Sequence, residues 1–306
     1  MLRYALKKIL KLIPMIITIV IVTFFIIRMI PGDPVRLMLG KEASVETVEN
    51  MREELGYNDP ILVQLGRYFK TLLQGDLGVC QRTGEQNLDI IRRVFPVTFC
   101  LALFSTLFSS FVGVILGIIS AVRRGKIADN AISVMTLVFI SMPSFFLGLL
   151  LLLFFSLKLR WLPVYSNGSW NQFVLPVLSL GLVELGYIAR TTRSSLLDVI
   201  SQDYIRTSRA KGLRKHTVIY RDALKNALIP IITSVGMRFG SLLAGATITE
   251  TVFSIRGIGS VMLEAINTRD YTLMQSCILV VSLTFVVVNT LTDILYTVVD
   301  PRIRLK

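Results

Sequence analysis

The sequence predicts an all-α membrane protein with six transmembrane helices. Its 306 residues are 53% hydrophobic and only 17% charged, whereas soluble domains carry about 25% charged residues. The mean hydropathy is +0.66, and several long segments contain no charged residue. A membrane span needs about 20 mostly apolar residues, because each backbone polar group inside the bilayer is hydrogen-bonded within its own helix. This composition excludes a disordered chain and argues against a soluble enzyme.

Six segments meet the requirement for a membrane span to different degrees. They are residues 12–27, 94–122, 130–157, 173–189, 227–249 and 271–292. Four of them carry no charge, and the last continues as an apolar run past Asp293 to Val299. The two weaker candidates contain Glu184 and Arg238. We therefore predict six helices, the first of them flanked by basic side chains that can extend to the membrane surface.

The first apolar segment is predicted to be an uncleaved helix within residues 1–30. Basic residues precede it, as in a signal peptide, but its apolar run is long and no small-residue cleavage site follows. The turn sequence PGDP at residues 31–34 comes next. It opens an extracytoplasmic segment, residues 31–93, in which the stretches 45–55 and 61–73 are typical of short amphipathic helices. Residues 94–306 form the predicted five-helix core.

The distribution of charge predicts the orientation of the chain. If the N-terminus is cytoplasmic and the six helices alternate, the net charge is about +14 on the inner segments and about +1 on the outer segments. The segment 31–93 is long, so its own charges carry little topological weight. We expect both termini of this multi-pass protein to lie in the cytoplasm of a bacterial cell, with the spans in its inner membrane.

The residues that would indicate an enzyme are missing from the sequence. Neither Gly-Lys pair belongs to a G-x-x-x-x-G-K-[ST] motif, so nucleotide hydrolysis has to come from another protein. One histidine, His216, cannot build a zinc protease site, and the three cysteines form no Cys-x-x-Cys pair. We expect a non-catalytic chain without a metal site. An ATP-independent secondary transporter or channel stays open as an alternative, although no inverted repeat is evident.

The longest inner segment, residues 190–225, has a pattern of its own. Apolar residues recur at helical spacing from Leu196 to Ile205, Gly212 provides a helix stop, and a second helix starts near Thr217. The pattern indicates a short rigid element that faces the cytoplasm. The alternative is a basic amphipathic segment that rests on anionic headgroups.

This segment resembles the coupling loop of ABC importer permeases. The stretches DYIRTSRAKGL at 203–213 and ALKNALIP at 223–230 look like the first-subunit type of the dipeptide/oligopeptide/nickel permease family. Further matching stretches follow one another along the chain: IPGDP at 30–34, LGYNDP at 55–60, GDLG at 75–78, WLP at 161–163, ETVF at 250–253, GIG at 257–259, RDY at 269–271 and DPRIR at 300–304. Each is weak alone, but together they cover nearly the whole chain in order.

The resemblance implies a type I importer architecture and the partners that go with it. These are a second permease subunit, two ATPase subunits that bind ATP and Mg, and an extracytoplasmic protein that delivers the substrate. This chain itself would bind no cofactor and no nucleic acid. The substrates implied are dipeptides, oligopeptides, glutathione or nickel chelates. The residues implied in ATPase coupling are Tyr204, Arg206, Thr207, Ser208, Ala210, Lys211, Gly212, Asn226 and Pro230.

The chain departs from the family pattern in three places. Arg206-Thr207-Ser208 stands where the wider importer motif has Glu-Ala-Ala, Arg256 stands where proline is usual, and Thr272 follows a motif after which proline is common. The last two changes lie outside the coupling segment, and we expect them to affect contacts with the binding protein.

Charged residues within predicted spans are expensive and usually face a bundle interior or a water path. Glu184, Arg238 and Glu250 are therefore predicted to line the translocation path. Glu184 and Arg238 could instead form a structural ion pair, or Arg238 could hold the second subunit. Glu250 lies near a span end and could anchor a loop. Glycines four residues apart, at 113 and 117 and at 236 and 240, are predicted helix contacts, either within this chain or with the second permease subunit.

Overall fold

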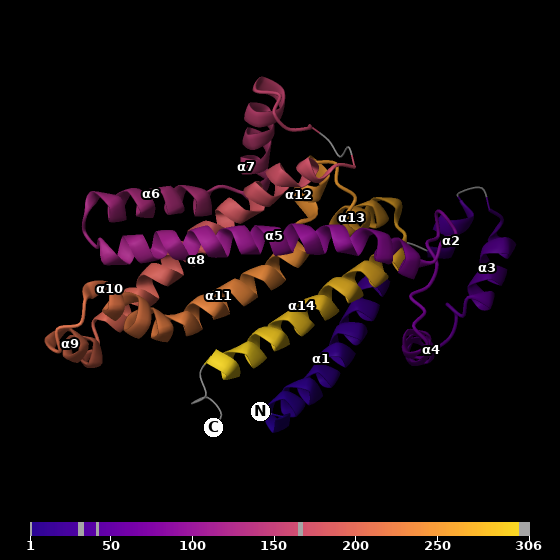
Figure 1. Cartoon of the computed structure of the whole chain (residues 1–306). Coiled ribbons are helices and arrows are strands. Elements are labelled where there is room, and N and C mark those ends of the chain that lie inside the picture. Colours follow the sequence, from indigo (N-terminus) through magenta and orange to yellow (C-terminus); the bar gives the residue numbers. More distant parts are fainter. Residues whose placement is uncertain (1, 30–33, 41–42, 165–167, 300–306) are drawn as a thin grey trace.

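The computed structural model describes residues 2–29, 34–40, 43–164 and 168–299 (Figure 1). Within these ranges the chain is built from helices, and the pairing of strands is limited to one isolated bridge between Val79 and Gln86. The prediction of an all-α membrane protein is confirmed.

Five long helices carry the predicted spans. They are α1 (Leu2–Arg28), α5 (Asn87–Val122), α8 (Val174–Ile200), α11 (Leu224–Gly245) and α14 (Tyr271–Val299). The shorter α-helices are α2 (Pro34–Leu39), α3 (Val45–Glu54), α4 (Ile61–Leu73), α6 (Ile127–Ser141), α7 (Ser144–Leu151), α9 (Asp203–Ala210), α10 (Lys215–Thr217), α12 (Thr247–Val252) and α13 (Ile258–Thr268). Two π-helices, η1 (Leu152–Lys158) and η3 (Val218–Ala223), and the 3-10 helix η2 (Trp170–Phe173) complete the described chain.

The third predicted span along the chain is broken and not continuous. Residues 130–157 are predicted to form one helix, but α6 and the segment from α7 to η1 meet at an angle of 102°. The break falls at Met142, which has an extended backbone (φ −90°, ψ 131°), and at Pro143. Proline lacks a backbone N–H and disfavours the helical conformation of the residue before it. The described residues thus hold five continuous spans, or six when the bent pair counts as one.

Helix α8 lies at the centre of the bundle and packs against α5, α6, α7 and α11. The approach to α5 is close because glycine lines it: a Cβ added at Gly117 would lie 2.5 Å from the Cβ of Thr192 and 2.6 Å from the carbonyl oxygen of Ala189. Gly236 in turn faces Thr292 of α14. The predicted glycine contacts are therefore confirmed, and they join helices within this chain.

The segment between the first two spans matches its predicted helices closely. The predicted stretches 45–55 and 61–73 appear as α3 and α4, and the Ser44 hydroxyl caps α3 by accepting a hydrogen bond from the Thr47 amide at 3.1 Å. Helix α5 starts at Asn87, seven residues before the predicted start of the span. The buried Asn87 amide explains the early start, because it donates to Ser276 and to the Leu77 carbonyl.

The two ends of the bundle differ in what they carry. Figure 1 shows α9 and α10 on the same side of the bundle as the start of α1 and the end of α14, and α2, α3 and α4 on the opposite side. We refer to these as the α9 end and the α4 end.

Candidate functional site

A short helix, α9, lies at the end of α8 and carries most of the residues implied in coupling (Figure 1). The predicted loop 190–225 is partly long helix, since α8 continues to Ile200 because Leu196 is buried against α5 and α11. The chain breaks at Gln202, whose backbone is extended, and α9 begins at Asp203. The predicted order of helix, glycine stop and helix is present, with the first helix in two pieces.

One apolar side chain fixes α9 to the bundle. Ile205 is fully buried, in a cluster with residues of α5, α8, η3 and α11. The other members of this cluster are Ile118, Ala121, Leu196, Val218, Ile219, Ala223, Ala227 and Ile231. The cluster therefore connects α9, through η3, to α8 and to the ends of α5 and α11.

Gly212 makes the turn after α9. Its backbone has φ +77°, a conformation that side chains with a Cβ avoid, and its amide donates to the Arg209 carbonyl at 2.9 Å. A Cβ built at this position meets no atom within 4 Å. The requirement for glycine is therefore one of backbone conformation and not of space.

The remaining implied coupling residues of α9 point away from the bundle. Tyr204 is 44% exposed and the Arg206 side chain is 75% exposed, with an ion pair of 3.5 Å to Asp203 on the same helix. Thr207, Ala210 and Lys211 are exposed as well, and Ser208 is half-buried. Together with Gly212 they form one outward surface of small, basic and aromatic side chains.

Two implied coupling residues lie apart from this surface. Asn226 and Pro230 are exposed positions on α11, which follows the π-helix η3 in the chain. Asn226 donates through its side-chain amide to the Asp222 carbonyl at 2.8 Å. Such π-helical turns often occur at functional sites because they insert an extra residue into the helix.

Glu184 and Arg238, predicted to line the path, meet in the structure. Arg238 Nε lies 3.6 Å from Glu184 Oε2, and its guanidinium lies 3.6 Å from the ring centroid of Tyr187. The Glu184 side chain is 11% exposed and that of Arg238 is 33% exposed. The pair joins α8 to α11 while leaving part of the guanidinium accessible.

Glu250 makes its contacts elsewhere. Its side chain is fully buried, and its carboxylate accepts from the Thr98 hydroxyl at 2.5 Å and from the Ser260 amide at 2.8 Å. Thr98 accepts in turn from the Ile258 amide. Glu250 thus joins α5, α12 and the first turn of α13, where a carboxylate is favoured by the exposed amides. These contacts describe a structural anchor, and a role in the path stays a prediction.

A buried ion pair joins α6 to α8, and the sequence did not predict it. Arg193 donates to both carboxylate oxygens of Asp129, at 2.8 and 2.9 Å, and Asp129 also accepts from the Gly125 amide at 2.9 Å and from the Ser120 hydroxyl. The Asp129 side chain is 3% exposed. The two partners are 64 residues apart in the chain, and the sequence offers no signal that pairs this aspartate with one arginine among many.

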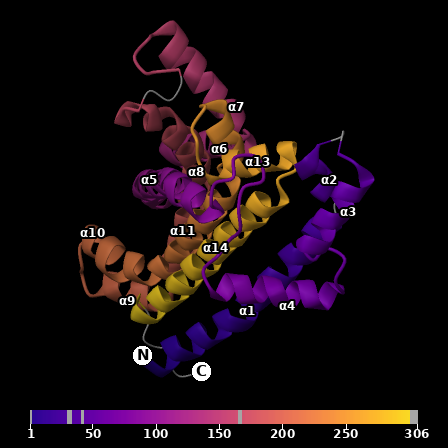
Figure 2. The same ribbon diagram turned by 90° about the vertical axis from the view of Figure 1, so that its right-hand side faces the viewer.

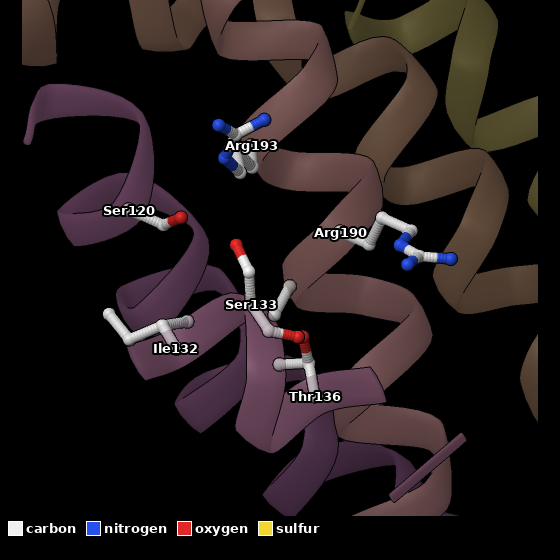
Figure 3. Close-up of a pocket in the computed structure, with 7 residues that line it drawn as sticks. Ser120, Ile132, Ser133, Thr136, Arg190 and Arg193 are labelled. Carbon is white, nitrogen blue, oxygen red and sulfur yellow. The ribbon is translucent and has the colours of Figure 1, made fainter. Parts of the chain in front are cut away.

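A polar cavity of about 190 Å³ opens beside this ion pair (Figure 3). Ser120, Ser133 and Thr136 line it, together with Arg190 and Arg193. Figure 3 shows the Arg193 guanidinium above Ser133 and the Arg190 guanidinium turned away from the cavity. The cavity lies between α5, α6 and α8, and Arg193 belongs both to its lining and to the ion pair.

Two family models match the sequence. One, described as the inner membrane component of binding-protein-dependent transport systems, matches residues 113–305. The other, for the N-terminal part of such membrane components, matches residues 1–102. The chain belongs to this permease family. The family prediction from the coupling loop is therefore confirmed, and the permease is a multi-pass protein of the inner membrane.

Two relatives align with the permease over nearly its whole length. It is 41% identical over 332 aligned positions to the dipeptide transport system permease protein DppB of Alkalihalophilus pseudofirmus, covering 99% of this chain and all of the relative. It is 38% identical over 306 positions to the glutathione transport system permease protein GsiC of Escherichia coli strain K12, with both chains fully covered.

Solved structures of importers share the fold of the permease. A chain of the MetNI methionine ABC transporter in an inward-facing conformation matches with a TM-score of 0.59 and 19% identity, over 69% of this chain and 97% of that chain. A chain of an amino acid ABC transporter matches with a TM-score of 0.51 and 14% identity, over 70% and 94%. The predicted type I importer architecture is confirmed.

Substitution of Asp129 tests the ion pair. Asp129→Ala leaves the Arg193 guanidinium without its buried partner, and removing one member of a buried pair costs about 3–5 kcal/mol. We expect a clear fall in the thermal unfolding midpoint of the purified permease in detergent. Asp203→Asn, which breaks the exposed ion pair with Arg206, should leave the midpoint unchanged. Equal midpoints for the two variants would show that the Asp129 ion pair contributes nothing.

Proposed function

We propose that this permease is one half of the membrane channel of an ATP-driven importer for short peptides. Its relatives are named for dipeptide and glutathione transport, which supports a substrate with a peptide backbone, and a nickel chelate stays a second possibility. An extracytoplasmic binding protein delivers the substrate. An ATP-independent transporter is not favoured, because the family consists of components of binding-protein-dependent systems.

The proposed assembly contains a second permease subunit and two ATPase subunits. The ATPase subunits bind ATP and Mg, and this chain binds no cofactor. The α9 end faces the cytoplasm with both termini, as the charge asymmetry of the sequence suggests. The α4 end faces outward, where the binding protein docks.

The observation that carries this proposal is the structure of α9. Its outward surface is free to contact an ATPase subunit, while Ile205 ties the helix to α5, α8 and α11. ATP-driven closure of the ATPase subunits then displaces α9, and the rigid attachment passes this displacement to the spans. Small residues in the outward surface, Ser208, Ala210 and Gly212, allow close approach of the ATPase surface.

Substitution of Gly212 tests the coupling. Proline cannot adopt φ +77° and removes the amide that caps α9, so Gly212→Pro should displace the outward surface. We expect the assembled transporter in proteoliposomes to hydrolyse ATP while substrate uptake per ATP falls severalfold. Gly212→Ala keeps the amide but is still disfavoured at φ +77°, so it should lower uptake per ATP less than Gly212→Pro does.

Gly168 offers a matched control for this experiment. It has φ +77° as well, lies in the loop before η2, and donates its amide to the Gln172 side chain. Gly168→Pro should leave uptake per ATP unchanged. Full coupling in the Gly212→Pro transporter would contradict the proposed contact between α9 and the ATPase.

We further propose that Glu184 and Arg238 face the translocation path. The pair carries both signs of charge and is held at 3.6 Å, looser than a direct hydrogen bond, and the Arg238 side chain is one third exposed. A zwitterionic peptide offers a carboxylate to Arg238 and an amine to Glu184. The pair can therefore exchange its internal contact for contacts with the two termini of the substrate.

Uptake of capped dipeptides tests this role. Arg238→Gln should reduce discrimination against C-amidated dipeptides, and Glu184→Gln should reduce discrimination against N-acetylated ones, each measured as competition for uptake in proteoliposomes. A purely structural pair gives another result. Both single variants would then lose thermal stability, the double variant would recover it, and the preference among capped peptides would not change.

A further inference from the structure

Helix α4 lies across the end of the bundle. In Figure 1 it is seen nearly end-on while α5 runs lengthwise, and in Figure 2, after a turn of 90°, α4 is seen lengthwise and α5 nearly end-on. The axis of α4 is therefore close to perpendicular to that of the spanning helix α5. It lies beside the last turn of α1, where the first candidate span ends at Arg28.

One side of α4 packs on α1. The Tyr68 ring lies 5.8 Å from the Phe24 ring, measured between centroids. The Arg28 guanidinium also stacks on the Phe24 ring, 3.5 Å from its centroid. Gln64 Oε1 accepts two hydrogen bonds from Arg28, at 3.1 and 3.2 Å. Burial on this side raises the pKa of Tyr68 to about 12. The inner side of α4 is thus fixed at the depth of Arg28.

Away from the side that packs on α1, α4 has an apolar stripe that is largely exposed in the described chain. Leu62 is 73% exposed and Leu73 is 87% exposed, and the half-buried Phe69 lies between them at helical spacing. The exposed residues Arg67 and Lys70 occupy the other side of the helix. Exposing Leu62 and Leu73 to water instead of burying them would cost about 1.5–3 kcal/mol for each side chain.

Apolar side chains of α1 remain exposed up to the last turns of its span. Val22 and Ile26 are 47% and 53% exposed within a candidate span of which 22% is buried. Helix α4 lies at the level where this apolar surface ends. A helix with one apolar and one basic side, lying perpendicular to the spans at that depth, has the character of an interfacial membrane helix.

We propose that α4 lies in the membrane interface at the α4 end, with Leu62, Phe69 and Leu73 inserted between the lipid headgroups and the acyl chains. Arg67 and Lys70 then face the headgroups and water. The Gln64 amide donates to the Tyr57 and Asp59 carbonyls at 2.9 and 2.8 Å. An inserted α4 therefore sets the height of the turn between α3 and α4 above the membrane.

Spin labels test the position of α4 directly. Single cysteines replace Leu62, Leu73 or Lys70 in the full chain, in a background where Cys80, Cys100 and Cys277 are changed to alanine. The labelled permease is assembled with its partner subunits in vesicles of phosphatidylethanolamine and phosphatidylglycerol. Collision with oxygen, which partitions into lipid, is compared with collision with a water-soluble nickel chelate. An unchanged thermal unfolding midpoint of each labelled variant shows that it is folded.

We expect the ratio of oxygen to nickel collisions to be severalfold higher at positions 62 and 73 than at position 70. A ratio at 62 and 73 that equals the ratio at 70 overturns the proposal. Shielding from both reagents that appears only after a binding protein is added also overturns it, because the stripe would then be a protein contact. The result does not depend on peptide transport, so it stands or falls separately from the proposed function.

Discussion

The packing of α8 in the middle of the bundle is the constraint on which the rest of this permease depends. The helix contacts α5, α6, α7 and α11, and its approach to α5 is so close that no side chain fits at Gly117. Interiors packed at this density respond to displacement by rigid shifts and not by local compression. Several candidate functional elements belong to α8 or follow it: Glu184 lies along its length, Arg193 near its last turns, and α9 beyond its end.

This arrangement explains why the candidate coupling element can be small. Helix α9 has eight residues, and an isolated helix of that length is unstable in water. Its stability comes from Ile205 below it and from the glycine turn after it. At the opposite end, the buried Glu250 carboxylate accepts from Thr98 and holds the start of α13. The buried Asp270 carboxylate accepts from the Gln81 and Leu273 amides and holds the start of α14. Polar anchors thus hold the α4 end, and an apolar one holds α9.

The membrane spans and the permease family could be predicted from the sequence because both depend on contiguous stretches of residues. Apolar runs of about 20 residues report the bilayer directly, and the stretch from Tyr204 to Gly212 lies in one motif. Long-range pairing was not predictable: Asp129 finds Arg193 across 64 residues, and Asn87 finds Ser276 across 189. The 102° bend was missed although Pro143 marks it, because an apolar composition alone does not distinguish a straight span from a broken one.

Ile205 attaches α9 to the cluster shared by α5, α8, η3 and α11. Uptake per ATP hydrolysed measures whether this attachment couples α9 to the spans. Ile205→Ala removes most of the buried side chain, a change that typically costs about 2–5 kcal/mol in a packed core, and Ile205→Val keeps the contact. We expect the alanine variant, assembled with its partners in proteoliposomes, to hydrolyse ATP but transport little, while the valine variant transports normally. Unchanged uptake per ATP in the alanine variant would show that Ile205 does not couple α9 to the spans.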